Sequence, residues 1–168
     1  MKYTSRTVLT SIIFSASVGL VYGEESATES CDSESEITIT NWQNWQKLTK
    51  KPIVSEGHDN SWVDIFVNEL AADNYRNTRI PYPVCAKIVK VSYKDEEGKI
   101  FKGLTAMVKM PNGYDSSWGD WWYANYEDMG LIAKKQGRLF YECISCHRAA
   151  LETDFLFSKE VMTEINEH

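Results

Sequence analysis

The stretches VCAKIVKVSY (residues 84–93), DEEGK (95–99) and FKGLTAMVKM (101–110) give the clearest structural signal in this chain of 168 residues. The first and third are rich in β-branched and aromatic residues, which favour strands. The charged stretch between them contains a glycine, as tight turns between antiparallel strands commonly do. The sequence therefore predicts a β-hairpin, around which the rest of the fold is expected to be built.

Shorter runs of similar composition predict further strands on both sides of the hairpin. These runs lie at residues 53–54, 62–67, 121–126 and 137–141. Helices are predicted from Asn68, as N-cap, to about Arg76, and at residues 148–151 and 159–165. We therefore expect an α+β domain, with an antiparallel β-sheet of about four or five strands and flanking helices.

A short amphipathic helix is also predicted before the first strand. Trp42, Trp45 and Leu48 recur at three-residue spacing behind Thr40, which is a suitable N-cap residue. The aromatic face of this helix is expected to pack on the domain.

The first 23 residues have the features of a secretory signal peptide. Lys2 and Arg6 precede an apolar stretch over residues 8–22, which is followed by Gly23. The apolar stretch has about 15 residues, fewer than the roughly 20 that span a bilayer. We interpret residues 1–23 as a cleaved signal that sends the protein to the periplasm or another exported location, with an uncleaved anchor as the alternative. No membrane span is expected after cleavage.

The region after the signal is acidic. Residues 24–38 hold acidic, serine and threonine residues and few apolar ones, which predicts a flexible acidic leader before a single domain at residues 39–168. Without residues 1–23 the net charge is −8. This charge argues against nucleic acid as a partner.

CISCH (residues 143–147) is the attachment sequence of haem c. The two thiols add to the haem vinyl groups, and the adjacent imidazole binds the iron on its proximal side. A zinc site would need a second pair of cysteines at similar spacing, and a redox pair normally opens a helix early in a βαβ unit. The sequence therefore predicts one haem c, covalently held by Cys143 and Cys146, with His147 as the proximal iron ligand.

The residue on the other side of the iron decides whether the haem binds gases or only transfers electrons. Cys85 lies at the start of the hairpin and is either a thiolate ligand or a small buried hydrophobic residue. Cys31 lies in the predicted leader, where it is either unpaired or bonded to another chain. The other candidate ligands are His58, His168, Met107, Met110 and Met129.

With this motif near the C-terminus of a β-rich chain, the sequence resembles the cytochrome P-460 and cytochrome c′-beta family from about residue 57 to residue 157. The matching stretches are Gly57-His58, residues 66–68 and 75–76, Tyr82-Pro83, residues 88–90 and 106–109, residues 113–115 and 119–121, the CISCH motif, and residues 153–155. The resemblance implies a haem c held against the sheet, and a homodimer or a heterodimer with a related cytochrome.

The resemblance also assigns two positions in the hairpin. In the hydroxylamine-oxidising members a strand lysine is bonded to the haem edge, and Lys90 occupies the matching position. These enzymes use a distal glutamate for proton transfer, and the matching position here is Thr105. Because a hydroxyl group does not titrate near neutral pH, Thr105 argues against hydroxylamine oxidation by the family mechanism.

Lys90 and Cys85 are five residues apart, so a regular strand directs their side chains to opposite faces. If Lys90 faces the haem, Ile88 shares its face, and if Cys85 does, Val89 shares its face. A bend after Pro83 would let both approach the cofactor. The sequence leaves these arrangements open.

The expected function is that of a periplasmic mono-haem c cytochrome that binds small gases such as NO or CO, or transfers electrons to a redox partner protein. His147 is the expected proximal ligand and Cys85 the suspected sixth ligand, as in a less common His/Cys-ligated branch that the resemblance implies. The alternatives are a hydroxylamine-oxidising enzyme with a Lys-linked haem and a plain carrier cytochrome. Thr105 favours a protein that is not an enzyme.

Overall fold

The computed structural model describes residues 30–129, 133–137 and 141–167. The predicted signal peptide and residues 24–29 of the predicted leader lie outside these ranges. Within the described ranges, no helix has both the length and the apolar character that a bilayer-spanning segment needs.

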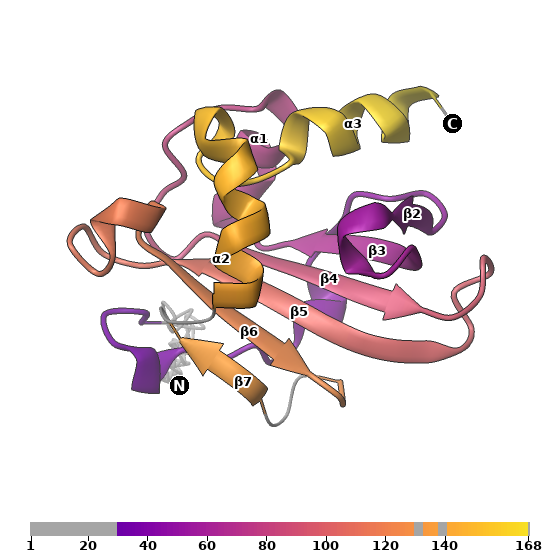
Figure 1. The fold of residues 1–168 in the computed structure, drawn as a ribbon, viewed down its shortest axis with the longest axis horizontal. Helices are drawn as coiled ribbons and strands as arrows, with labels where there is room; N and C mark the ends of the chain where they lie inside the picture. Colours follow the sequence, from indigo (N-terminus) through magenta and orange to yellow (C-terminus); the bar gives the residue numbers. More distant parts are fainter. Residues whose placement is uncertain (1–29, 130–132, 138–140, 168) are drawn as a thin grey trace, which may run out of the picture.

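An antiparallel sheet forms the centre of the molecule (Figure 1). In the described residues it has seven strands, in the order β1-β3-β4-β5-β6-β7, with β2 paired to β3 beside β1. The strands are β1 (Gln46–Lys47), β2 (Ile53–Ser55), β3 (Ser61–Val67), β4 (Lys87–Tyr93), β5 (Phe101–Lys109), β6 (Trp121–Tyr126) and β7 (Ala133–Gly137). The predicted α+β class and the antiparallel sheet with flanking helices are confirmed.

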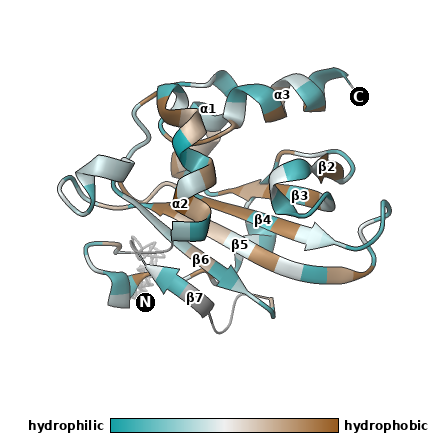
Figure 2. Ribbon diagram, in the orientation of Figure 1, coloured by the Kyte–Doolittle hydropathy of each residue, from teal (hydrophilic) through white to brown (hydrophobic). Residues whose placement is uncertain are grey.

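The hairpin of β4 and β5 forms as predicted and lies in the middle of the sheet. Its loop is organised by Asp95, whose carboxylate accepts hydrogen bonds from the backbone N–H groups of Lys99, at 3.0 Å, and Ile100, at 2.5 Å. Gly98 adopts a φ of 68°, the left-handed conformation that glycine tolerates best. Figure 2 shows hydrophilic residues in this loop and hydrophobic residues along the central strands.

Three helices cover one face of the sheet (Figure 1). They are α1 (Glu69–Asn77), α2 (Tyr141–His147) and α3 (Ser158–Glu167). Asn68 caps α1 as predicted, because its Oδ1 accepts a hydrogen bond from the Ala71 N–H at 3.1 Å. The core on this face contains Ile88 and Met107 from the hairpin and Ile144 from α2.

The other face of the sheet is covered by the segment that precedes β1. Cys31, Ile39 and Trp42 are buried there against Val89 and Trp122, among other side chains of the hairpin and β6. Residues 30–38 therefore differ from the predicted flexible leader in the part that the structure describes. The apolar residues responsible, Cys31 and Ile39, are too few and too widely spaced in the sequence to reveal the contact.

The predicted helix around Trp42 is wrong. Only a 3₁₀ turn, Trp42–Asn44, forms, and the chain then enters β1, where Gln46 pairs with Val67. Leu48 continues this pairing, because its N–H donates to the Ile65 carbonyl at 2.9 Å. Pairing with the open edge of β3 satisfies the hydrogen bonds of these backbone groups. It therefore outweighs the helical preference indicated by the three-residue spacing of apolar side chains.

Two other elements differ from the prediction. The strand predicted at residues 137–141 is wrong, because β7 ends at Gly137 and Tyr141 begins α2, while residues 138–140 lie outside the described ranges. The helix predicted at residues 148–151 is a 3₁₀ segment, Arg148–Thr153.

Candidate cofactor site

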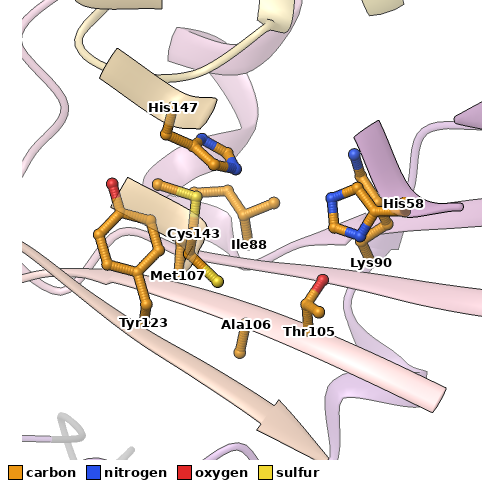
Figure 3. A pocket seen from close by; sticks show the side chains of 9 residues that line it. All are labelled: His58, Ile88, Lys90, Thr105, Ala106, Met107, Tyr123, Cys143 and His147. Carbon is orange, nitrogen blue, oxygen red and sulfur yellow. The ribbon is translucent and has the colours of Figure 1, made fainter. Parts of the chain in front are cut away.

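A pocket lies between α2 and the helix-covered face of the sheet. Figure 3 shows its lining, which consists of His58, Ile88, Lys90, Thr105, Ala106, Met107, Tyr123, Cys143 and His147. The pocket therefore brings together four residues predicted to hold or contact a haem: Lys90, Thr105, Cys143 and His147.

His147 is the last residue of α2, and its ring orientation is fixed by one hydrogen bond. Its Nδ1 lies 2.7 Å from the carbonyl oxygen of Phe155. Because a carbonyl oxygen only accepts, Nδ1 carries the proton and Nε2 keeps its lone pair. The ring packs edge-on against Tyr123 and Phe157, with centroids 5.6 Å away in each case. A histidine held in this way is suited to bind a metal through Nε2.

The charge state of His147 agrees with that role. Burial lowers its pKa to about 4, the hydrogen bond to Phe155 opposes the shift, and the nearby Lys90 adds to it. The imidazole is therefore neutral at pH 7, as a metal ligand must be.

The two motif cysteines lie one helical turn apart on α2. Cys143 is partly buried and lines the pocket, whereas Cys146 is exposed. Neither forms a disulfide within the described part of the chain. Ile144, between them, is buried in the core, which holds α2 against the sheet.

The Phe155 carbonyl is held in place by an anchor formed by the adjacent Asp154. Lys109 Nζ lies 2.7 Å from Asp154 Oδ2, and both side chains are about one-tenth exposed. The carboxylate also accepts from the Tyr82 N–H at 3.0 Å, and the Asp154 carbonyl accepts from Trp121 Nε1 at 2.8 Å. Asp154 thus ties the segment after the CISCH motif to β5, β6 and the loop before β4.

Gly119 provides the space for the Phe155 ring. A Cβ atom at residue 119 would lie 2.4 Å from Phe155 Cδ2, and the φ of Gly119 is 70°. Both facts require glycine here. Gly119 and Phe155 both lie in stretches that carry the family resemblance, and this contact is a physical reason for their pairing.

Lys90 and Thr105 are direct neighbours across the hairpin. They are paired in the register of β4 and β5 and both line the pocket. Burial lowers the pKa of Lys90 to about 8, and its Nζ donates to Ser55 Oγ at 3.4 Å. Ile88 shares the face of Lys90, whereas Val89 lies on the opposite face. Of the two strand orientations left open by the sequence, the structure has the one that directs Lys90 into the pocket.

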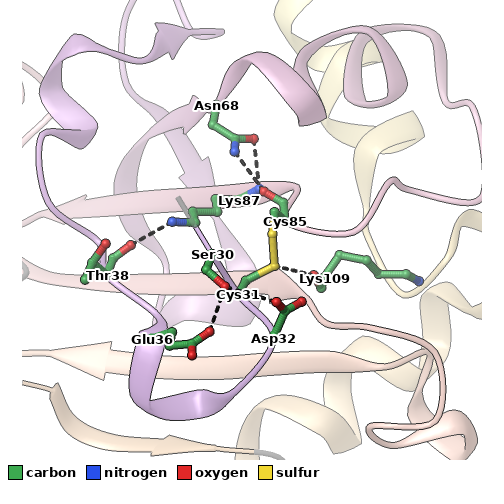
Figure 4. The surroundings of a disulfide bond; sticks show 9 residues. All are labelled: Ser30, Cys31, Asp32, Glu36, Thr38, Asn68, Cys85, Lys87 and Lys109. Carbon is green, nitrogen blue, oxygen red and sulfur yellow. Dashed lines mark hydrogen bonds between the residues drawn. A yellow bond between two sulfur atoms is a disulfide. The ribbon is translucent and has the colours of Figure 1, made fainter. Parts of the chain in front are cut away.

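The prediction that Cys85 is an iron ligand is wrong. Cys85 forms a disulfide with Cys31, so it has no thiolate to bind a metal. Figure 4 shows this bond, which joins the segment that precedes β1 to the chain just before β4. Cys85 packs on the face of the sheet opposite the pocket, with Val89 and Trp42. The same disulfide contradicts both expectations for Cys31, which is fully buried and bonded within its own chain.

Of the other sulfur and imidazole candidates, only His58 and Met107 line the pocket. Met110 is buried on the opposite face, Met129 is 44% exposed, and His168 lies outside the described residues. Burial, with contributions from Lys90 and His147, lowers the pKa of His58 to about 3, so this imidazole is also neutral.

Sequence reasoning missed Tyr123, which lies beside His147. Its hydroxyl group is buried and has no hydrogen-bond partner in the described structure. Side chains alternate along β6, so Tyr123 lies on the same face as Trp121. This alternation could have placed Tyr123 on the pocket face from the sequence.

The donor set fits a haem. A neutral, oriented imidazole and two cysteine side chains lie on one helix, and the facing wall includes the apolar side chains of Ile88 and Met107. Tyr123 adds a buried hydroxyl group that a polar substituent could satisfy.

Comparison with known protein families agrees with this geometry. The family model described as Cytochrome P460 matches residues 39–158, which include every residue that lines the pocket. No curated protein matches the chain.

Proposed function

Since this chain belongs to the cytochrome P460 family, a family of haem c proteins, we propose that it is an exported mono-haem c cytochrome that binds a small gas such as NO or CO at its iron. The haem would be attached through Cys143 and Cys146, with His147 as the proximal ligand. The iron would supply reversible gas binding and one-electron exchange with a redox partner protein.

The residues of the site support this role in distinct ways. The His147–Phe155 hydrogen bond, at 2.7 Å, fixes the proximal imidazole before any ligand arrives. Ile88 and Met107 contribute apolar side chains to the pocket wall. Thr105 can donate a hydrogen bond to a bound ligand without transferring a proton.

The observation that carries the proposal is the absence of a carboxylate from the pocket lining in the described residues. Proton-coupled oxidation of a substrate needs a group that titrates near the working pH. Thr105 stands at the position where the resemblance places that group, and its neighbour across the hairpin is the cationic Lys90. The pocket is therefore better suited to holding a gas than to oxidising a substrate.

One observation favours oxidation of hydroxylamine as a second candidate function. Lys90 lines the pocket, and burial lowers the pKa of its amine to about 8. A larger fraction of this amine is unprotonated at neutral pH than in an exposed lysine, which favours bond formation to a haem edge.

Spectroscopy and turnover separate these possibilities. The purified protein should retain haem stain on a denaturing gel, whereas a Cys143→Ala/Cys146→Ala variant should not. The ferrous form should shift its absorption on titration with NO or CO, and the ferric form should not oxidise hydroxylamine in the presence of an electron acceptor. Covalent haem in the double variant would overturn the attachment. Hydroxylamine turnover would overturn the gas-binding role.

Export and assembly form part of the same proposal. Haem is attached to CISCH-type motifs outside the cytoplasm, which agrees with the predicted signal at residues 1–23. We further propose a dimer, of like or related chains, as the resemblance implies. Periplasmic fractionation and light scattering of the purified protein test these two points.

A further inference from the structure

His58 is a pocket residue to which the function proposed above gives no role. It ends the 3₁₀ turn Glu56–His58 between β2 and β3, and its side chain lines the pocket. Figure 3 shows its imidazole across the cavity from His147, on the side of Lys90 and Thr105. We propose that His58 is the second axial ligand of the haem iron, opposite His147, an inference that rests on the haem site proposed above.

The His58 ring is available to bind a metal. Within the described part of the chain it makes no hydrogen bond, and it is partly buried. A ring without a hydrogen-bond partner keeps a nitrogen lone pair that can bind a metal. Imidazole nitrogen is also a common ligand for haem iron.

The turn that carries His58 is fixed on both sides. Ser55 and Ser61 face one another in the pairing of β2 with β3. Lys90 Nζ donates to Ser55 Oγ at 3.4 Å, and Lys102 Nζ donates to Ser61 Oγ at 2.7 Å. These two hydrogen bonds hold the turn beside the pocket, and they therefore fix the position of His58.

The turn itself is tightly bent. Asp59 and Asn60 both have left-handed backbone conformations, with φ of 56° and 50°. Asp59 also lies 3.5 Å from Lys102 Nζ. The bend reverses the chain directly after His58, which leaves the imidazole projecting from the turn toward the sheet face that forms the pocket.

The other donors in the lining are less suitable. Lys90 is hydrogen-bonded to Ser55, and a protonated amine cannot bind iron. The Thr105 hydroxyl is a weak ligand for iron. Met107 has a thioether that can bind haem iron, but its side chain is also part of the core packed between the sheet and the helices.

Axial binding by His58 would lower the apparent affinity of the haem iron for a gas. An external ligand would have to displace His58, so its apparent affinity would fall with the fraction of iron that is open. The resting protein would be six-coordinate and low-spin, a state that favours electron transfer. Gas binding would then be controlled by release of a single side chain.

The test uses the haem-loaded full-length protein and the electron paramagnetic resonance spectrum of its ferric form. We expect a low-spin spectrum typical of two imidazole ligands, replaced by a high-spin spectrum in His58→Ala. Added imidazole should restore the low-spin state in His58→Ala. The apparent CO affinity of the ferrous form should rise more than about tenfold in this variant, because displacement is no longer needed.

Two further variants serve as matched controls. Met107→Leu should keep the low-spin spectrum, and Cys85→Ala combined with Cys31→Ala should keep it as well. A high-spin wild-type spectrum, or a low-spin spectrum in His58→Ala without imidazole, would overturn the role of His58. Covalent haem staining of the same samples tests haem attachment separately. Failure of the His58 proposal can therefore be told apart from failure of the proposed function.

Discussion

Lys109 Nζ lies 2.7 Å from Asp154 Oδ2 in an ion pair that is about nine-tenths buried. Replacement of Lys109 by Met leaves a buried carboxylate without its cation, so we expect a loss of about 3–5 kcal/mol in the free energy of unfolding. Urea denaturation measures this. The matched control is Arg79→Met, which breaks the exposed 2.6 Å pair with Asp73 and should cost at most about 1 kcal/mol. Equal losses in the two variants would contradict a special role for the buried pair.

Gly119→Ala should disturb the proximal side of the site. The new Cβ would lie 2.4 Å from Phe155 Cδ2, so the ring and the carbonyl that orients His147 must move. We expect a stability loss of more than about 2 kcal/mol, together with a changed iron–histidine stretching band in resonance Raman spectra. Gly113→Ala is the control, because Gly113 also has a positive φ, 93°, but no atom within 4 Å of its Cβ position. It should lose about 1–2 kcal/mol and leave the band unchanged.

Removal of the disulfide should affect stability without altering the haem. Cys31 and Cys85 are separated by 54 residues, and a cross-link over such a loop contributes about 2–4 kcal/mol. The Cys31→Ala/Cys85→Ala variant should therefore unfold at lower urea concentration, while its visible spectrum matches that of the wild type. A reductant should lower the midpoint of the wild type and not that of the variant. A spectral change in the variant would restore Cys85 as a ligand candidate.

Lys90 should produce a pH dependence in alkaline solution. Burial lowers its pKa from 10.5 to about 8 in the folded protein, so between these values the unfolded chain binds the extra proton. The free energy of unfolding therefore rises with pH over this window, by at most about 1.4 kcal/mol per pH unit, relative to Lys90→Met. The comparison is best made on a Cys143→Ser/Cys146→Ser background, in which no haem is attached. A constant difference between pH 7.5 and 10.5 would contradict the buried position of Lys90.

Thr105→Glu should test whether the missing carboxylate is what prevents oxidation chemistry. The new side chain would face Lys90 across the hairpin, inside the pocket. We expect hydroxylamine-dependent reduction of an electron acceptor to appear in this variant and to be absent from Thr105→Gln, which has the same shape but does not titrate. Activity in both variants, or in neither, would show that a carboxylate at residue 105 does not control the reaction.

The sequence predicted the parts of the fold that depend on local patterns. The β4–β5 hairpin and the Asn68-capped helix form where expected, because strand composition, turn residues and a capping side chain all act over short distances. The segment around Trp42 was mispredicted, since its conformation depends on the edge of β3. The sequence of β7, AKKQG, lacks strand-forming composition, so this strand was missed; it forms by pairing with β6.

The candidate site also has a part that local sequence patterns predict and a part that depends on distant contacts. CISCH was identified from its spacing, and His147 and Cys143 lie in the pocket. The fate of Cys85 could not be derived, because its partner Cys31 is 54 residues away in a segment whose composition suggests disorder. The importance of Asp154 and Gly119 was also hidden, because both act through Phe155, whose backbone carbonyl holds His147.

The sheet separates the four cysteines of this chain into two chemically different pairs. Cys31 and Cys85 are bonded on one face, while Cys143 and Cys146 lie on a helix that covers the other. If the chain is exported and loaded with haem as proposed, the first pair must be oxidised while the second stays reduced until haem is added. Because the sheet lies between the two pairs, mixed disulfides are disfavoured once the hairpin has formed. Under the proposed function, the folding order of the sheet would therefore be a step in haem attachment.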